Sequence, residues 1–366
     1  MQQVQVAVAD VSLEGLAKVK KRELDQSFFK KGIFLGLFSG ITYGLYSAFI
    51  TAAQNVGVWS NWWSSFESTS FIAIFIFPTI ASALNDLCSA IWALVVTAKQ
   101  GKLGDFTLTL KSKPGRIMIG AALVGGPIAT TSYIIALSQA GPIASPVAAL
   151  NVTAGAIFGR VLYKQKLSGR TILGIATCLV ASIMIGSTAL TGEMGSGVTT
   201  GLFFAVIAAL GWGLEGTIAG FGTSMIDFQI GITIRQCTSG IANLCILLPV
   251  LSIIGNVGVG TVFNFVGQVV TNTPWCFIFL LSGFFAYISF ASWYKGNSMC
   301  GSALGQALNG TYTFFAPLFT WIVVGIAMGL EGYSLAPIAW LAAIVMMVGI
   351  FIIAVNPKEF SRREEK

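Results

Sequence analysis

Two short stretches place polar side chains inside otherwise apolar sequence. AALNVTAGA occupies positions 148–156 and QALNGTYTF occupies positions 306–314, so Asn151 and Asn309 both stand in the word Ala-Leu-Asn-x-Thr. At membrane depth, an amide side chain either hydrogen-bonds a neighbouring helix, at about 1 kcal/mol per bond, or binds a polar ligand. Both interpretations stay open, and the repetition predicts that the two asparagines lie near each other at the centre of the fold.

Two carboxylates, Asp86 and Glu215, stand in apolar segments without a basic residue one turn away. A carboxylate removed from water must either bind a cation or take up a proton. Arg235 is the basic residue available as a buried partner, and it can pair with Glu215 or with Asp227. Because one arginine cannot neutralise both buried carboxylates, at least one of them is expected to face a cavity. A structural ion pair is the alternative for either carboxylate.

Aromatic side chains accompany these polar groups, and aromatic walls favour cations and flat rings. Tyr43 lies close in sequence to Tyr46, and Trp212 lies close to Glu215. For each ring, packing against protein or lipid is an equally open alternative. The candidate substrate-binding residues are Tyr43, Asp86, Asn151, Trp212, Glu215, Asn243, Gln306, Asn309 and Tyr312, and the candidates for ion coupling or an ion pair are Asp86, Glu215 and Arg235.

The composition indicates the environment of these residues. Hydrophobic residues make up 55% of the 366 residues and charged residues only 10%, whereas a soluble domain carries about 25% charged residues. The chain is therefore predicted to be an all-α integral membrane protein. It contains no histidine, and its six cysteines lack the spacing of a metal site. We accordingly expect neither a metal nor a cofactor.

Several function classes are disfavoured by the same sequence. There is no Walker motif with its GK[ST] ending, so ATP-driven pumping is not supported. No nucleophile–base pair and no long catalytic loop can be identified, which argues against an enzyme. A membrane scaffold or receptor-like protein is a remaining alternative, although buried carboxylates would be a needless cost in it.

Ten segments are long and apolar enough to be expected as membrane-spanning helices. They lie at 32–54, 68–97, 116–138, 143–163, 170–190, 199–222, 228–254, 274–295, 301–328 and 335–355. With a cytoplasmic N-terminus, all 21 Lys and Arg fall on the cytoplasmic side. The only charged residues in the loops on the opposite side are Glu67, Glu193 and Glu331. This bias predicts that both termini are cytoplasmic, and it explains the net charge of +7 without a nucleic-acid partner.

Three pairs of similar stretches occur in the same order along the chain. Residues 31–47 match residues 200–216 at an offset of 169, and SALNDLCS at 82–89 matches SGIANLCI at 239–246 at an offset of 157. The asparagine words match at an offset of 158. These pairs predict one five-helix unit used twice, at 31–190 and 199–355, between cytoplasmic tails at 1–30 and 356–366. Because five is odd, the second unit is inverted, and such repeats place a binding site near the midplane.

The predicted architecture resembles the drug/metabolite transporter superfamily, in its EamA-like branch, over residues 31–355. The stretch 329–332, Gly-Leu-Glu-Gly, matches the hydrophobic-Gly-Glu motif at the end of the ninth helix, and Pro317 matches the proline of that helix. The first copy departs from the pattern, with Gln165 in place of the usual glutamate and no proline after Pro146. The resemblance implies a secondary transporter that works by alternating access.

The expected function is therefore transport of a small polar organic metabolite across a lipid bilayer. Compact loops favour the inner membrane of a bacterium, and a eukaryotic organelle membrane is the alternative, because nucleotide-sugar carriers share this superfamily architecture. The protein is expected as a monomer or a homodimer. Proton coupling through Asp86 or Glu215 is a further hypothesis. Export of cationic or aromatic compounds is the alternative form of transport.

Overall fold

Helices joined by turns make up the described part of the chain. The computed structural model describes residues 13–164, 168–190, 197–223, 225–300 and 302–354, and it contains no strand within them. The N-terminal half holds α1 (Leu13–Ala53), α2 (Val58–Ser65), η1 (Ile72–Ile76), α3 (Phe77–Lys99), α4 (Leu103–Lys111), α5 (Lys113–Leu123), η2 (Val124–Thr130), α6 (Thr131–Ala140), η3 (Gly141–Ile143), α7 (Ala144–Ala148), α8 (Asn151–Tyr163) and α9 (Gly169–Leu190). The C-terminal half holds α10 (Val198–Thr223), α11 (Phe228–Ala242), η4 (Asn243–Leu247), α12 (Leu248–Ile254), α13 (Val259–Thr271), α14 (Thr273–Cys300), α15 (Ser302–Asn309), α16 (Tyr312–Thr320), η5 (Trp321–Ala327) and α17 (Pro337–Ala354).

Within the described residues, seven helical segments are long and apolar enough to cross a membrane. They are Gln26–Ala53, Ile72–Lys99, Lys113–Ala148, Val198–Ala219, Phe228–Ile254, Cys276–Cys300 and Leu304–Ala327. Three shorter apolar helices occupy Gly169–Ile185, Val259–Thr271 and Pro337–Ile353. The chain is thus an all-α protein with the helices of a multi-pass membrane protein.

The elements differ from the predicted segments in several places, and the helices α2 and α4 occupy regions predicted as loops. The first helix begins at Leu13 and not at 32, because the Lys-, Glu- and Leu-rich stretch before the apolar segment also favours helix. The apolar helix α13 occupies a region predicted as a loop. Arg235, counted above with the cytoplasmic loops, lies buried within α11. Residues 1–12 and 356–366 of the predicted tails, with Gln165 and Glu193, lie outside the described residues.

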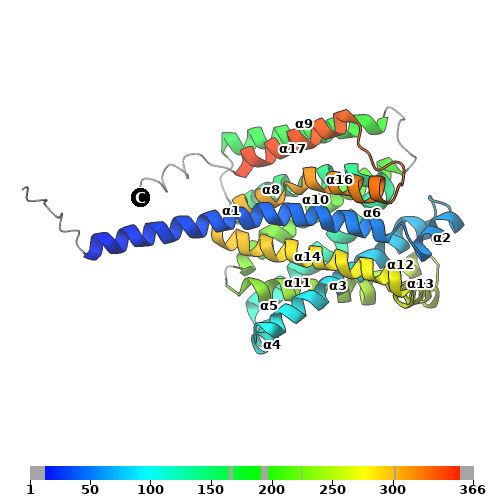
Figure 1. Ribbon diagram of the computed structural model, residues 1–366, viewed down its shortest axis with the longest axis horizontal. Helices are drawn as coiled ribbons and strands as arrows, with labels where there is room; N and C mark the ends of the chain where they lie inside the picture. Colours follow the sequence, from blue (N-terminus) through cyan, green and yellow to red (C-terminus); the bar gives the residue numbers. More distant parts are fainter. Residues whose placement is uncertain (1–12, 165–167, 191–196, 224, 301, 355–366) are drawn as a thin grey trace, which may run out of the picture.

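The helices pack in a regular pattern of partners. The first helix, α1, packs along α14 and then along α15 and α16, while α10 packs against α6 and α8. Helix α3 lies between α11 and α14, and α9 pairs with α17 on one edge of the bundle (Figure 1). The N-terminal part of α1 projects beyond one end of the bundle, and α2, α12 and α13 gather at the other end (Figure 1).

Glycines allow α1 and α10 to lie unusually close to their partners. Gly32, Gly36, Gly40 and Gly44 recur at every fourth position on the α1 face that meets α14–α16. A Cβ atom at Gly44 would lie 2.7 Å from the carbonyl carbon of Phe315. Small residues at this spacing let helices in membranes approach until their backbones are in contact.

The same device is found on α10. A Cβ atom at Gly201 would lie 2.5 Å from the Cβ of Ala140 at the end of α6. One at Gly213 would lie 2.6 Å from the Cβ of Ala154 and 3.0 Å from the carbonyl oxygen of Asn151. Thus α10 approaches α6 and α8 as closely as α1 approaches α14 and α16.

We predict that Gly44→Ala lowers the free energy of unfolding by about 1–3 kcal/mol, because the added methyl group overpacks the α1–α16 contact. The matched control is Gly104→Ala in α4, where a Cβ atom meets nothing within 4 Å. That change should be neutral or stabilise by up to about 1 kcal/mol, since alanine favours helix over glycine. Unfolding of the two variants in detergent measures both effects, and equal effects would contradict the packing argument.

Candidate functional site

Three charged side chains are buried among the described residues, and they are the three predicted for ion coupling or an ion pair: Asp86, Glu215 and Arg235. Each is at most 1% exposed. Asp86 comes from α3, Glu215 from α10 and Arg235 from α11. The bundle therefore encloses two carboxylates and one guanidinium group, and their contacts decide which carboxylate is neutralised.

Arg235 pairs with Glu215, one of its two predicted partners. Its Nε donates to Oε1 of Glu215 at 3.0 Å. Nη1 donates to Oε1 of Gln236 at 2.9 Å, and Nη2 donates to Oγ1 of Thr130 at 3.2 Å. The guanidinium carbon lies 4.0 Å from the centre of the Phe290 ring, within cation–π range. The arginine is thus held on several sides, and none of these hydrogen bonds goes to Asp86.

Asp227, the other predicted partner of Arg235, is engaged elsewhere. Its Oδ2 accepts from Nζ of Lys102 at 2.9 Å, and both side chains are about one-third exposed. Its Oδ1 accepts from the backbone N–H of Gln229 at 2.9 Å and so caps the beginning of α11. Asp227 therefore caps a partly exposed helix end. Of the two predicted partners of Arg235, only Glu215 forms the buried ion pair.

Asp86 lies in a cluster of neutral polar groups, which we call the Asp86 cluster: Ser82, Asp86, Thr131, Ser239 and Asn243. Ser239 donates a short hydrogen bond to Oδ2 of Asp86, and Nδ2 of Asn243 lies 3.5 Å from the same oxygen. Asn243 also donates to Oγ of Ser82 at 3.1 Å. Thr131 donates to Oγ of Ser82 at 3.0 Å and lies 3.2 Å from Oδ1 of Asn243. Asp86 and its predicted counterpart Asn243 are thus in direct contact.

A glycine pair in η2 allows these two polar regions to form side by side. A Cβ atom at Gly125 would overlap the carboxylate of Glu215, and one at Gly126 would overlap the hydroxyl of Ser239. The carbonyl oxygen of Gly125 accepts from Oγ1 of Thr130 at 2.8 Å. The widened π-helical turns of η2, which include Pro127, loosen the usual helical hydrogen bonding at this point. The backbone of η2 therefore lies directly against both carboxylate regions.

An aromatic cluster surrounds Tyr43 at the centre of the bundle. The Tyr43 ring lies 4.4 Å from that of Tyr312 and 5.9 Å from that of Trp212, measured between ring centres. Tyr46 and Tyr133 contact the same ring at 5.1 and 5.8 Å. Four helices, α1, α6, α10 and α16, supply these five side chains. Predicted residues from both halves of the chain, Tyr43, Trp212 and Tyr312, are thereby brought together.

Several polar atoms in and around this cluster are buried without a hydrogen-bond partner among the described residues. In the aromatic cluster they are the hydroxyls of Tyr43, Tyr46 and Tyr312 and the indole nitrogen of Trp212. The hydroxyl of Tyr133 is different, because Ser47 and Ser145 bind it at 2.8 Å each. Buried polar groups are normally hydrogen-bonded, so a group of unpartnered ones needs an explanation such as a ligand or an ion.

Three of the four amide side chains predicted for the site, those of Asn151, Gln306 and Asn309, lie outside the Asp86 cluster. Oδ1 of Asn151 and Nε2 of Gln306 are buried and unpartnered among the described residues. A Cβ atom at Gly216 in α10 would lie 2.9 Å from Nε2 of Gln306. Asn309 instead donates a short hydrogen bond to Ser39 of α1. No hydrogen bond joins Asn151 to Asn309 in the described part of the chain.

Both asparagine words lie at interruptions of a helix. A turn at 149–150 separates α7 from α8 directly before Asn151, and a turn at 310–311 separates α15 from α16 directly after Asn309. The two amides thus flank short turns that divide each segment into two helices. Such discontinuous helices leave backbone groups free to bind substrates and ions in transporters.

A cavity of about 240 Å³ opens near one end of the bundle, beyond the aromatic cluster. It is lined by Thr51, Gln54, Asn55, Trp63, Leu137, Ser138 and Tyr333. Burial raises the pKa of Tyr333, although Asn55 donates to its hydroxyl at 2.9 Å, so the phenol stays protonated at neutral pH. Thr51 donates to the carbonyl of Ser47 at 2.8 Å, and Ser47 in turn contacts Tyr133. Polar groups therefore lead from this cavity to the aromatic cluster.

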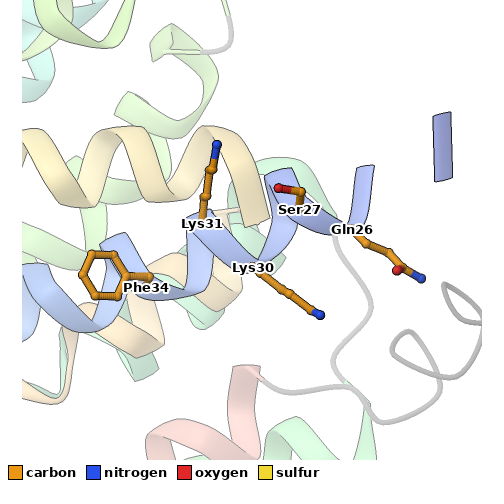
Figure 2. A pocket seen from close by; sticks show the side chains of 5 residues that line it. All are labelled: Gln26, Ser27, Lys30, Lys31 and Phe34. Atoms are coloured by element: carbon orange, nitrogen blue, oxygen red, sulfur yellow. The ribbon is translucent and has the colours of Figure 1, made fainter. Parts of the chain in front are cut away.

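A second depression, of about 490 Å³, lies on the outside of α1 near its beginning. Its lining is Gln26, Ser27, Lys30, Lys31 and Phe34, and the two lysine side chains point in different directions (Figure 2). It contains no residue predicted for the site. It is therefore separate from the Asp86 cluster, the Arg235–Glu215 pair and the aromatic cluster.

Some residues of the Asp86 cluster, and the glycine pair that lies against it, are not among the candidates identified from the sequence. Ser82 and Ser239 stand in the matched stretches, whereas the candidate residues from these stretches are only Asp86 and Asn243. Thr131 and the pair Gly125–Gly126 carry no distinguishing sequence signal, since hydroxyls and glycines are frequent in membrane helices for packing alone. The matched positions of Ser82 and Ser239 were the signal that could have found them.

Comparison with known proteins identifies the fold and no activity. No protein-family model matches the sequence, and no curated protein matches it. A solved structure described as "Crystal structure of protein" aligns with 89% of this chain and 97% of its own chain. The TM-score is 0.52 and 15% of the residues are identical. At this identity the similarity concerns the fold alone.

We predict that Glu215→Gln and Arg235→Met each lower the free energy of unfolding by about 3–5 kcal/mol, because each leaves a buried charge without its partner. The double variant should lose much less than the sum of the two. The control is Lys102→Met, which removes an exposed pair and should cost at most about 1 kcal/mol. Additive losses in a double-mutant cycle would contradict direct coupling of Glu215 with Arg235.

Proposed function

We propose that the protein is a secondary transporter that carries a small polar organic metabolite across a membrane by alternating access. The observation that carries this proposal is the group of unpartnered polar atoms of Tyr43, Tyr46, Trp212 and Tyr312 at the meeting point of both halves. Each unpartnered buried group costs about 1–3 kcal/mol. A site that is filled by a polar ligand in the working cycle accounts for that cost.

The proposed architecture is ten membrane helices in a five-plus-five inverted repeat, with cytoplasmic termini, as in the EamA-like branch of the drug/metabolite transporters. Helix partners support it, because α1 contacts α14 and α16 as α10 contacts α6 and α8. The Gly32 face meets the end of α14, and the matched Gly201 face meets the end of α6. Seven segments have full spanning length; the repeat adds α8, α9 and α17 as further membrane helices.

The Asp86 cluster supports the repeat more directly. At the offset of 157, Ser82 corresponds to Ser239 and Asp86 corresponds to Asn243. The contact of Asn243 with Ser82 and the contact of Ser239 with Asp86 are then equivalent by symmetry. A twofold axis between α3 and α11 would relate one to the other. Contacts of this kind are expected where a twofold axis passes between α3 and α11.

The cavity between Thr51, Leu137 and Tyr333 is proposed as the vestibule on the non-cytoplasmic side. It lies beyond Tyr133 on α6 and beyond Ser47 on α1, at the end opposite the lysine-rich beginning of α1. Rocking of the two repeats would close this vestibule and open a path from the other end. A bacterial inner membrane remains the proposed location.

Export of cationic or aromatic compounds is a second candidate function, and the aromatic cluster favours it. Tyrosine and tryptophan faces attract cations and stack on flat rings. Two carboxylates to one arginine make the buried centre formally negative, which also favours a cation. A thermal-shift screen of the purified protein against polar metabolites and against organic cations distinguishes the candidates, because a ligand of the native state raises the unfolding temperature. A screen in which no compound of either class binds would contradict both.

We predict that Tyr312→Phe weakens binding of the screened ligand about 2- to 13-fold, because one hydrogen bond contributes about 0.5–1.5 kcal/mol. It should raise the ligand-free stability, by up to about 1–3 kcal/mol, because it removes a buried hydroxyl that has no partner in the described part of the chain. Tyr133→Phe is the matched control, and it should lower stability by about 1 kcal/mol, because Ser47 and Ser145 lose a partner. Unfolding temperatures with and without ligand measure both, and a stability loss in Tyr312→Phe with unchanged binding would contradict the proposed site.

A further inference from the structure

The buried centre holds one negative charge more than its positive charges neutralise. Among the described residues, Asp86 and Glu215 are the buried carboxylates and Arg235 is the buried base. Arg235 donates to Glu215, Gln236, Thr130 and Gly125, and to no atom of Asp86. A carboxylate at membrane depth without a counter-charge in contact is strongly disfavoured. Asp86 therefore requires one additional positive charge.

The neighbours of Asp86 form a set of oxygen donors suited to a hard cation. Oδ2 of Asp86 and the hydroxyls of Ser82, Thr131 and Ser239 converge from α3, α6 and α11. Thr131 and Ser82 oxygens lie 3.0 Å apart, and Oδ1 of Asn243 lies 3.2 Å from that of Thr131. These spacings are slightly shorter than the edges, of about 3.3–3.7 Å, of an octahedral shell with metal–oxygen distances of about 2.3–2.6 Å. Small shifts of these side chains would turn mutual hydrogen bonds into ligand bonds.

The charge of the cluster selects a monovalent ion. A single carboxylate faces neutral hydroxyls and two amides, since Asn85 donates to Oδ1 of Asp86 at 3.3 Å and Nδ2 of Asn243 lies 3.5 Å from Oδ2. Divalent cations are usually bound with more acidic ligands. No group of three or more acidic, histidine or cysteine side chains that could hold a metal occurs in the described ranges. Oxygen-only ligands exclude the soft metals, which prefer sulfur and imidazole.

The backbone around the Asp86 cluster contains irregular helical turns, as backbone at ion-binding sites often does. Asp86, Thr131 and Asn243 lie close to the middle of the spans Ile72–Lys99, Lys113–Ala148 and Phe228–Ile254. Thr131 directly follows the π-helical η2, and Asn243 begins the π-helical η4. Widened helical turns of this kind are frequent at functional sites, and loosened helices coordinate coupling ions in transporters. Thus two members of the Asp86 cluster, Thr131 and Asn243, each lie at a π-helical turn, and the two turns belong to different helices.

We propose that the Asp86 cluster binds one Na⁺ ion, with Asp86, Ser82, Thr131 and Ser239 as ligands and Asn243 as their support. The contacts described above support binding of the ion. A role of this site in coupling ion flow to transport rests in addition on the proposed function. A proton needs a single acceptor, whereas hydroxyls from three helices converge here. Glu215 is excluded as the carrier of the additional cation because Arg235 already neutralises it.

The test measures unfolding of the full chain in detergent at one pH and one ionic strength, in NaCl, KCl or choline chloride. Na⁺ should raise the unfolding temperature in a saturable manner that K⁺ and choline do not reproduce. Asp86→Asn should abolish this response, and Ser82→Ala should weaken the apparent affinity about tenfold. Glu67→Gln, an exposed carboxylate outside the cluster, is the control and should respond like the wild type.

Equilibrium dialysis of the wild type with radioactive sodium provides the independent measurement, with one ion bound per chain expected. This measurement decides the matter even if Asp86→Asn does not fold. Equal unfolding temperatures in all three salts, or a Na⁺ response kept by Asp86→Asn, would overturn the site. Stabilisation by acid alone, equal in the three salts and without bound sodium, would assign a proton to Asp86 and equally overturn it. Binding of an organic ligand without any dependence on Na⁺ would refute the coupling role and leave the transporter intact.

Discussion

A charge inside a membrane bundle must be neutralised by a group within reach, and this constraint organises the centre of the molecule. Coulomb attraction between Arg235 and Glu215 acts in a medium of low dielectric constant, where it is far stronger than in water. Holding the pair requires α10, α11 and η2 to meet at one point. The carbonyl of Gly125 and the hydroxyl of Thr130 are then available to satisfy the remaining guanidinium protons. Removing the pair would therefore disturb three helices at once.

Close helix contact is what makes this neutralisation geometrically possible. A side chain at Gly125 or Gly126 would occupy the space of the Glu215 carboxylate or the Ser239 hydroxyl. Lipid chains are as apolar as leucine, so no hydrophobic force draws membrane helices together, and close packing must supply the attraction. The glycine faces of α1 and α10 serve this purpose for the whole bundle. The polar centre and the glycine faces thus depend on each other.

The all-α, multi-pass character of the fold could be predicted from sequence, because apolar segments of spanning length report directly on the bilayer. Candidate residues could also be named, since a buried carboxylate stands out in any apolar segment. Their contacts could not be predicted in the same way. Whether Arg235 pairs with Glu215 or Asp227 depends on which way a face of α11 turns, and hydropathy does not contain that information. The closeness of Tyr43 to Tyr312 likewise arises from packing between segments far apart in the chain.

In the proposed repeat, the residues nearest the twofold axis are those in which the two copies differ in charge. Asp86 faces Asn243 where strict symmetry would place two carboxylates in contact. Two such carboxylates would repel each other, and one of them would take up a proton. With an amide in one copy, the site keeps a single negative charge and a set of neutral oxygens around it. Tyr46 and Glu215 differ in the same way, and Glu215 has Arg235 as its partner. Divergence of the two copies at the axis thus supplies one cation site and one neutral ion pair, where an exact repeat would supply repulsion.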